Sequence, residues 1–150
     1  MRKIFSHDLP ADLFSHSEQE VFFITVCCEP RGVNQLAKPE IWQAVLGTIE
    51  HREKAGDLEC RLLLAMPDHL HGLFHFPQAS RMKAAISAVK AWLAKNHGIR
   101  WQRDFFDHRL RGWESAEEKR KYILMNPVRG GLVQKPEDWP FKRDCRDPTP

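Results

Sequence analysis

The apolar positions of this chain recur with two periods, which predict an alternation of strands and helices. A β-branched and aromatic run at residues 21–28 is typical of a buried strand. Apolar side chains at helical spacing follow at residues 39–54, with Pro39 at the start and Gly56 beyond the end. The same patterns predict further strands at residues 58–65, 70–76 and 105–110, and further helices at residues 82–96 and 115–126.

The last predicted helix has its own start and stop signals. Ser115 and Glu118 fit the S-x-x-E capping box, and Pro127 disfavours helical backbone at Asn126. The resulting order, β-α-β-β-α-β-α, predicts an α+β fold: a ferredoxin-like β-α-β-β-α-β antiparallel sheet with an additional C-terminal helix. The 150 residues suit one domain, and 42% hydrophobic residues can build its core.

Composition narrows the class of protein further. No apolar run reaches the roughly 18–20 residues of a membrane span, and the N-terminus lacks the apolar region of a signal peptide, so we expect no membrane partner. The four cysteines include no C-x-x-C pair, which argues against a structural zinc site. We therefore expect a reduced, cytoplasmic protein.

The net charge of +3 conceals an asymmetry between the two halves of the chain. Residues 1–75 carry 7 Lys and Arg against 11 Asp and Glu, whereas residues 76–150 carry 16 against 9. A basic half is expected of a protein that binds the phosphate backbone of nucleic acid. A solvated basic face without any partner would show the same pattern.

Two histidines at the start of the third predicted strand are candidate metal ligands. His69 and His71 flank Leu70, so they point to the same face of a strand. There they could share a divalent metal or hold a phosphate, although half-exposed strands also carry such pairs without any site. Gly72 would let a ligand or a neighbouring element approach closely. His75 lies about 13 Å beyond His71 at ~3.3 Å per residue, too far to share one metal.

One tyrosine stands among nine Phe and five Trp. It is Tyr122, four residues before Asn126, and this spacing places the two side chains one above the other on a helix. A phenol beside a carboxamide could be a nucleophile beside a metal or water ligand. A tyrosine at the edge of the core and an Asn at the helix end would produce the same pattern.

Two segments resemble the motifs of single-tyrosine HUH transposases, a superfamily named for a His–bulky apolar–His signature. Residues 65–72, AMPDHLHG, resemble that signature, and residues 122–133, YILMNPVRGGLV, resemble the C-terminal one. The branch that the chain resembles best is the REP-associated tyrosine transposases, which act on repetitive extragenic palindromes. Three shorter matches favour this branch, at residues 23–26, 101–111 and 138–141.

The departures from the family pattern are small. Asp68 stands where family members more often have Asn, and we place it on the turn rather than in the site. Asn126 fits this branch, whereas the broader insertion-sequence group tends to have Gln there. The resemblance implies a single HUH transposase-like domain over residues 1–150, with a leader at 1–20, a core at about 21–141 and a tail at 142–150.

The resemblance also implies a site and a reaction. His69 and His71 would bind one Mg²⁺ or Mn²⁺, and Asn126 would complete the protein ligands. The Tyr122 hydroxyl would attack a phosphodiester of single-stranded, palindromic hairpin DNA, which would leave a 5′-phosphotyrosine link and a free 3′-hydroxyl. A phenol with a pKa near 10 needs activation at pH 7, and a metal is a recognised source of it. The protein would act as a monomer, or as a homodimer in which Tyr122 reaches across.

The basic half then supplies candidates for phosphate contacts. These candidates are Arg81, Lys83, Lys90, Arg109, Arg111, Lys119, Arg120, Lys121 and Arg129. Trp101 and Phe105 either pack in the core or stack on an unpaired base. Two alternatives stay open: a hairpin-binding protein without catalysis, and a metal-dependent phosphodiesterase that uses water while Tyr122 is structural.

Overall fold

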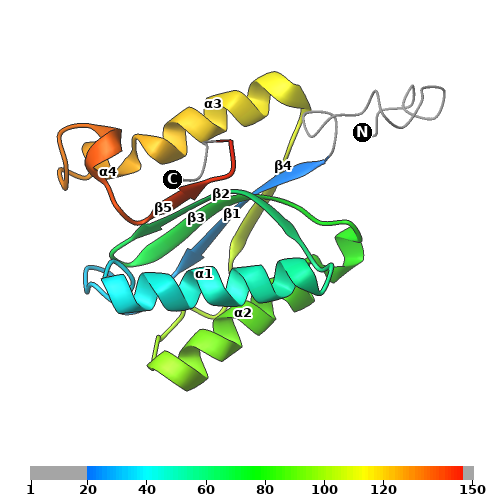
Figure 1. Ribbon diagram of the computed structural model, residues 1–150, viewed down its shortest axis with the longest axis horizontal. Coiled ribbons are helices and arrows are strands. Elements are labelled where there is room, and N and C mark those ends of the chain that lie inside the picture. The colour runs from blue at the N-terminus through cyan, green and yellow to red at the C-terminus, as the bar shows by residue number, and fades with distance from the viewer. Residues whose placement is uncertain (1–19, 147–150) are drawn as a thin grey trace.

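The computed structural model describes residues 20–146, which form an antiparallel sheet with helices on both faces (Figure 1). The sheet has five strands in the order β4-β1-β3-β2-β5. The strands are β1 (Val21–Cys27), β2 (Glu59–Met66), β3 (His69–His75), β4 (Phe106–Leu110) and β5 (Lys142–Asp144). The helices are α1 (Pro39–Lys54), α2 (Met82–His97), α3 (Gly112–Leu124) and α4 (Asn126–Arg129), with short 3₁₀ helices η4 (Ala79–Arg81) and η5 (Pro136–Asp138).

The predicted α+β class with an antiparallel sheet is confirmed. The turn predicted between the second and third strands is also present, because Met66 of β2 pairs with His69 of β3 around Pro67 and Asp68. Residues 1–19 and 147–150, which hold most of the predicted leader and the end of the predicted tail, lie outside the described residues.

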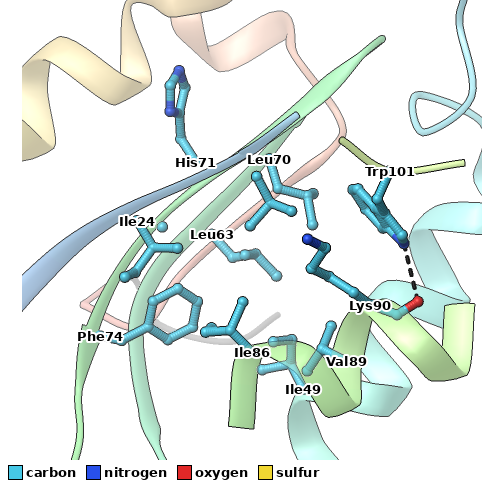
Figure 2. A pocket seen from close by; sticks show the side chains of 12 residues that line it. Ile24, Ile49, Leu63, Leu70, His71, Phe74, Ile86, Val89, Lys90 and Trp101 are labelled. Carbon is cyan, nitrogen blue, oxygen red and sulfur yellow. Dashed lines mark hydrogen bonds between the residues drawn. The ribbon is translucent and has the colours of Figure 1, made fainter. Parts of the chain in front are cut away.

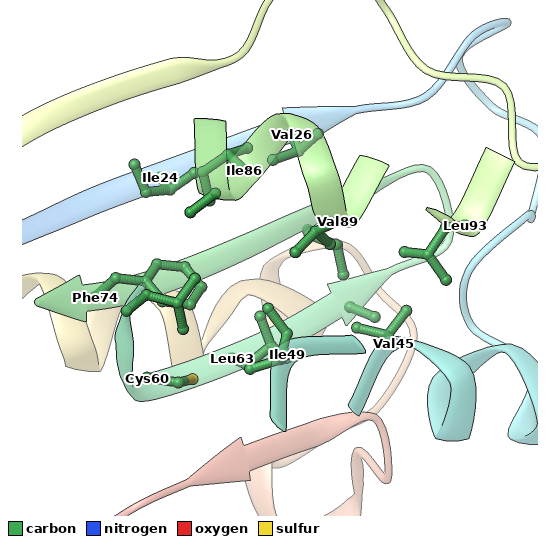
Figure 3. Close-up of a cluster of buried hydrophobic side chains, with 14 of the residues drawn as sticks. Ile24, Val26, Val45, Ile49, Cys60, Leu63, Phe74, Ile86, Val89 and Leu93 are labelled. Carbon is green, nitrogen blue, oxygen red and sulfur yellow. The ribbon is translucent and has the colours of Figure 1, made fainter. Parts of the chain in front are cut away.

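Each face of the sheet has its own hydrophobic core. α1 and α2 cover one face and α3 covers the other (Figure 1). The larger core lies under α1 and α2 and includes Ile24 of β1 and Leu63 of β2 (Figure 3). Their neighbours Phe23 and Leu64 belong instead to the smaller core under α3. Because both faces are covered, β1 and β2 are apolar without alternation.

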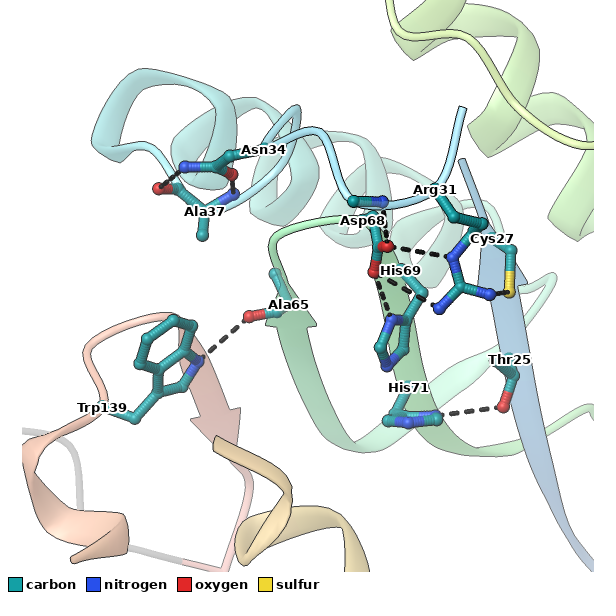
Figure 4. Close-up of polar contacts among 11 residues, drawn as sticks. Thr25, Cys27, Arg31, Asn34, Ala37, Ala65, Asp68, His69, His71 and Trp139 are labelled. Atoms are coloured by element: carbon teal, nitrogen blue, oxygen red, sulfur yellow. Dashed lines mark hydrogen bonds and ion pairs between the residues drawn. The ribbon is translucent and has the colours of Figure 1, made fainter. Parts of the chain in front are cut away.

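The segment predicted as a tail adds a strand to the sheet. β5 pairs antiparallel with β2, and the loop before it is fixed by the buried side chain of Trp139. The Trp139 indole Nε1 donates a hydrogen bond to the carbonyl oxygen of Ala65 at 3.0 Å (Figure 4). The backbone N–H of Ala65 in turn donates to the carbonyl oxygen of Phe141 at 2.9 Å. The C-terminal segment therefore docks on β2, the strand that precedes the turn into the His-x-His segment of β3.

The predicted capping box is wrong, because α3 begins earlier than expected. Its N-cap is Arg111, with no side-chain cap bond, and Ser115 lies inside the helix. The chain leaves β4 at Leu110 and turns directly into α3 at Gly112, where φ is +74°. Glycine adopts this backbone conformation without the steric cost that an L side chain would bring. The helix is already formed when the chain reaches Ser115.

The prediction that Tyr122 and Asn126 share one continuous helix is also wrong. α3 ends at Leu124, and α4 begins at Asn126 after a break at Met125. Pro127 explains the break, because it has no N–H to donate to a carbonyl one turn earlier and its ring clashes there. Tyr122 and Asn126 therefore lie on two short helices.

The space beside Gly72 is filled by a side chain of its own strand. A Cβ atom on Gly72 would overlap the Cε2 atom of Phe74, on the face that α1 and α2 cover. The expectation of an approaching ligand or neighbouring element is therefore wrong for this glycine. A glycine is needed at position 72 because the Phe74 ring occupies the space that a side chain would fill.

Replacing Gly72 by alanine is expected to lower the free energy of unfolding by about 1–3 kcal/mol, because the methyl group overpacks the core. Gly47→Ala is the matched control, since a Cβ there meets nothing within 4 Å. In the middle of α1 the control is expected to raise stability by about 0.5–1 kcal/mol. Urea unfolding followed by circular dichroism compares the two variants, and equal stabilities would contradict this role of Gly72.

Candidate functional site

Strand alternation brings the two histidines of β3 together on the α3 face of the sheet. The rings of His69 and His71 lie with their centroids 4.6 Å apart at an interplanar angle of 76°. Leu73, two residues further along β3, packs in the core under α3, which identifies the face. His75 is far from the pair, and its Nδ1 hydrogen bonds with the carbonyl oxygen of Glu20 at 2.8 Å.

A hydrogen bond to Nδ1 orients each of the two rings (Figure 4). Nδ1 of His69 donates to Oδ1 of Asp68 at 2.8 Å. Nδ1 of His71 shares a hydrogen bond of 3.0 Å with the hydroxyl of Thr25 on β1. Such contacts typically fix ring orientation in metal sites, and they leave Nε2 of each ring as the nitrogen available to a ligand.

Burial keeps both imidazoles uncharged. It lowers the pKa of His71 to about 3, and the charges of His69, Arg129, Lys119 and Arg31 act in the same direction. Burial also lowers the pKa of His69, although the neighbouring Asp68 carboxylate acts against the shift. Both rings are neutral at pH 7, which is the form of histidine that binds metals.

Asp68 lies on the turn, as predicted, and it also contacts the His pair through His69. Its Oδ2 accepts hydrogen bonds from Nε of Arg31 at 2.9 Å and from the backbone N–H of Gly32 at 2.8 Å. Burial alone would raise the pKa of Asp68, but the hydrogen bonds from Arg31, Gly32 and His69 outweigh it and lower the pKa. A carboxylate thus connects the Arg31 loop to the His pair.

Tyr122 reaches the same region from α3, together with two cations. Cζ of Arg129 lies 3.9 Å from the Tyr122 ring centroid, and Nζ of Lys119 lies 5.0 Å from it. Lys119 also lies 4.7 Å from the ring of Phe23, which stacks on His71 with centroids 5.4 Å apart. Lys119 therefore reaches from the tyrosine helix to Phe23, which lies next to His71. Tyr122 is 49% exposed.

Asn126 is placed by α4, which adjoins the tyrosine helix. Nη2 of Arg129 donates to the carbonyl oxygen of Tyr122 at 2.8 Å and so connects α4 to the end of α3. Within residues 20–146, no group of three or more His, Cys, Asp and Glu side chains could hold a metal ion. Asn126 stays a prediction for the role of a third protein ligand.

Some of the basic residues predicted to contact phosphate lie on the same side of the sheet as the His pair, and others do not. Lys119 and Arg129 lie at the site, and Arg111 and Lys121 are exposed at and along α3. Arg120 forms an ion pair with Asp144 of β5, on the other side of α3 from Tyr122. Helical geometry explains the division, since Lys119 and Tyr122 are three residues apart and share one side.

The remaining basic candidates lie away from the His pair. Arg109 forms an ion pair with Glu20, and Arg81 forms one with Asp57. Lys83 and Lys90 are on α2, across the sheet, where Lys90 donates to the carbonyl oxygens of Gln102 and Arg103 at 3.0 Å each.

Sequence reasoning missed Thr25 and Arg31, and it did not anticipate the contacts of Asp68 with His69 and Arg31. Thr25 belongs to β1 and meets His71 only through the pairing of β1 with β3. Arg31 lies 37 residues before Asp68 in the chain. One feature of the local sequence could have indicated the role of Asp68: its carboxylate directly precedes the first histidine and lies on a predicted turn.

A small cavity near the His pair does not belong to this site. It measures about 20 Å³ and lies among the apolar side chains between the sheet and the helices α1 and α2. Figure 2 shows His71 pointing away from it, to the other face of the sheet. Trp101 borders it and donates from Nε1 to the carbonyl oxygen of Lys90 at 3.0 Å. Trp101 and Phe105 pack against the larger core, so the packing alternative holds for both.

Comparison with known proteins confirms the resemblance seen in the motifs. The chain is 27% identical over 92 residues to the REP-associated tyrosine transposase of Escherichia coli K12, a match that covers 59% of this chain. The chain spans 56% of the length of that relative. It is also 27% identical over 147 residues to a Haemophilus influenzae protein named for the same family, covering 85% of this chain and 81% of the relative.

A solved structure of a REP-associated tyrosine transposase bound to a REP hairpin has a similar fold. It matches with a TM-score of 0.67 and 26% sequence identity, covering 81% of this chain and 74% of the other. No family model matches the chain. Within residues 20–146, no helix has both the length and the apolar character needed to cross a membrane.

Proposed function

We propose that this chain, which is similar in sequence and fold to REP-associated tyrosine transposases, cleaves and rejoins single-stranded hairpin DNA through Tyr122. One observation carries the proposal. The only tyrosine of the chain is brought, with Lys119 and Arg129, to the face of the sheet that holds the neutral His pair. A nucleophile, cations for a phosphate and two metal-type ligands thus meet on one surface.

The charges around the His pair favour a phosphodiester. Arg129, Lys119 and Arg31 are near enough to depress the pKa of His71, so their positive potential extends over the site. Both imidazoles are neutral, so the positive charge comes from these three cations, and the histidines can serve as metal ligands. Phosphate oxygens accept charge-assisted hydrogen bonds from Arg and Lys, which positions a DNA backbone without reading its sequence.

The residues present fit a divalent metal. His69 and His71 have oriented Nδ1 atoms and uncharged rings, and Asn126 would add an amide oxygen from α4. Mg²⁺ or Mn²⁺ held there would act as a Lewis acid on the scissile phosphate. The ligand set is neutral, so the charge of the cation stays available to phosphate oxygens.

The reaction is a transfer of a phosphoryl group to the protein. The Tyr122 oxygen bonds to the phosphorus as the bond from phosphorus to the 3′-oxygen breaks. The phenol loses its proton to solvent, and the departing oxygen takes one up to become a free 3′-hydroxyl. Lys119 and Arg129 beside the Tyr122 ring would contact the non-bridging oxygens of the phosphate under attack. The reverse attack by a 3′-hydroxyl rejoins a strand, because the link to tyrosine retains the energy of the broken bond.

An end-labelling experiment tests this proposal. The protein is mixed, in Mg²⁺ or Mn²⁺, with a pool of hairpin oligonucleotides that carry randomised single-stranded flanks. A label at the 3′ end should move with the protein on a denaturing gel, whereas a label at the 5′ end should appear on a shorter free strand. Free fragments with either label would indicate a water-using phosphodiesterase. Binding without cleavage would indicate a hairpin-binding protein, and either result would overturn the proposal.

Replacing Asp68 by alanine is expected to weaken Mn²⁺ binding by about 10–100-fold, because His69 loses the partner that orients its ring. Asp68→Asn, which keeps an acceptor, should lose much less. Asp107→Ala, an exposed carboxylate on β4, is the matched control. Titration with Mn²⁺ followed by electron paramagnetic resonance measures the affinity. Equal affinities for Asp68→Ala and the control would show that Asp68 does not orient His69.

A further inference from the structure

We infer that Phe106 is a stacking platform for an unpaired base next to the phosphate held at the His pair. The inference rests on the proposed function and deepens it, because it names the part of the DNA that this residue recognises. Phe106 is at the start of β4, the edge strand beside β1. Its ring contacts Phe23 edge to face, with centroids 5.9 Å apart at an angle of 70°.

Two separate contacts place Phe106 beside the His pair. Phe23, which holds the Phe106 ring, also stacks on His71 with centroids 5.4 Å apart. Thr25, which hydrogen bonds to His71, is the register partner of Phe106 on β1. The exposed ring therefore lies one side chain away from His71, a position that the base next to a bound phosphate can reach.

The face and the exposure of Phe106 distinguish it from a core residue. Leu110, four residues along β4, packs in the core under α3, and strand alternation directs Phe106 to that same face. The preceding Phe105 points the other way and packs against the core under α1 and α2. Phe106 is 55% exposed. An aromatic ring held at one edge and left open to solvent has a free π-face to offer.

The surrounding charge favours nucleic acid as the occupant. Lys119 contacts the same Phe23 ring from the α3 side, and Arg129 and Arg31 add positive charge around His71. Single-strand binding sites combine cations along the backbone with aromatic rings on which bases stack. Among the described residues, β4 is the outer strand of the sheet at this end, beside β1, and a single strand that enters the site from this edge would pass Phe106.

Three substitutions of Phe106 separate stacking from hydrophobic burial. The probes are one hairpin oligonucleotide with single-stranded flanks and the same hairpin without them. Phe106→Ala should weaken binding of the flanked hairpin by about tenfold, with little change for the flankless hairpin. Phe106→Trp should restore binding and Phe106→Leu should not. Trp92→Ala, which removes another exposed aromatic ring on α2, is the matched control and should behave as the unmodified chain.

Fluorescence of 2-aminopurine placed in the flank supplies a direct readout. Stacking on Phe106 should quench it, and Phe106→Ala should release the quenching. The inference would be overturned if Phe106→Leu restored binding, or if Phe106→Ala lost equal affinity for both hairpins. It would also be overturned if Phe106→Ala changed the mass of the free protein in solution, because Phe106 would then lie in a contact between copies of this chain. If the unmodified protein forms the adduct and Phe106→Ala binds the flank normally, the inference fails while the proposed function stands. If the unmodified protein neither binds nor cleaves hairpins, both fail.

Discussion

Replacing Tyr122 by phenylalanine is expected to abolish the covalent protein–DNA adduct, by at least about a thousandfold, while hairpin binding persists. The substitution removes only the hydroxyl that would attack the phosphorus. The ring stays, and with it the contacts of Arg129 and Lys119 that hold positive charge at the site. The measurement is the yield of gel-stable adduct beside the binding affinity for the same oligonucleotide.

The control for this variant is a nearby substitution of a residue to which we assign no part in metal binding, DNA binding or catalysis. Leu132→Ala suits, because Leu132 is an exposed apolar residue shortly after α4. It should form adduct as the unmodified chain does. The chain contains no other tyrosine, so adduct formation by Tyr122→Phe would require a nucleophile of another type and would refute the proposed mechanism.

Substituting either histidine of the pair should have the second largest effect. His69→Asn and His71→Gln are each expected to lower metal-dependent cleavage by about a thousandfold, since Lewis-acid activation contributes several kcal/mol and 1.4 kcal/mol is tenfold. These side chains are polar and similar in size, which limits the damage to packing around the buried His71. The single-turnover cleavage rate is measured across a range of Mn²⁺ concentrations.

His75 provides a matched control on the same strand. It faces the same side as the pair but lies at the other end of β3, where its Nδ1 bonds to the Glu20 carbonyl. His75→Gln should cleave at the normal rate and with the normal dependence on Mn²⁺. If all three variants cleave alike, the His pair does not hold the metal.

The sequence was sufficient to predict the parts of the site that depend on local periodicity. Alternation along one strand places His69 and His71 on one face, whatever the rest of the fold is. Helical spacing separates Lys119 from Arg120 in the same way. The sequence could not reveal which face of the sheet His69 and His71 occupy. The reason is that β1 and β2 are buried on both faces, and neither face has a polar pattern.

What could not be predicted depends on contacts between distant segments or on backbone turns. Asp68 is important because the Arg31 loop, 37 residues earlier, folds against it. Asn126 leaves the tyrosine helix because of a break at Met125 that the i, i+4 argument ignores. Phe105 and Phe106 are both aromatic, and only the register of β4 decides which packs against the core and which is exposed.

Mass spectrometry of the digested adduct tests the central claim most directly. After cleavage of hairpin DNA in Mn²⁺, the protein is digested with trypsin and nuclease, and the peptide that carries a nucleotide is sequenced. We predict a 5′-phosphonucleotide on Tyr122, in the peptide of residues 122–129 that follows Lys121. A nucleotide on any other residue, or cleaved DNA without a nucleotide-bearing peptide, would contradict the account.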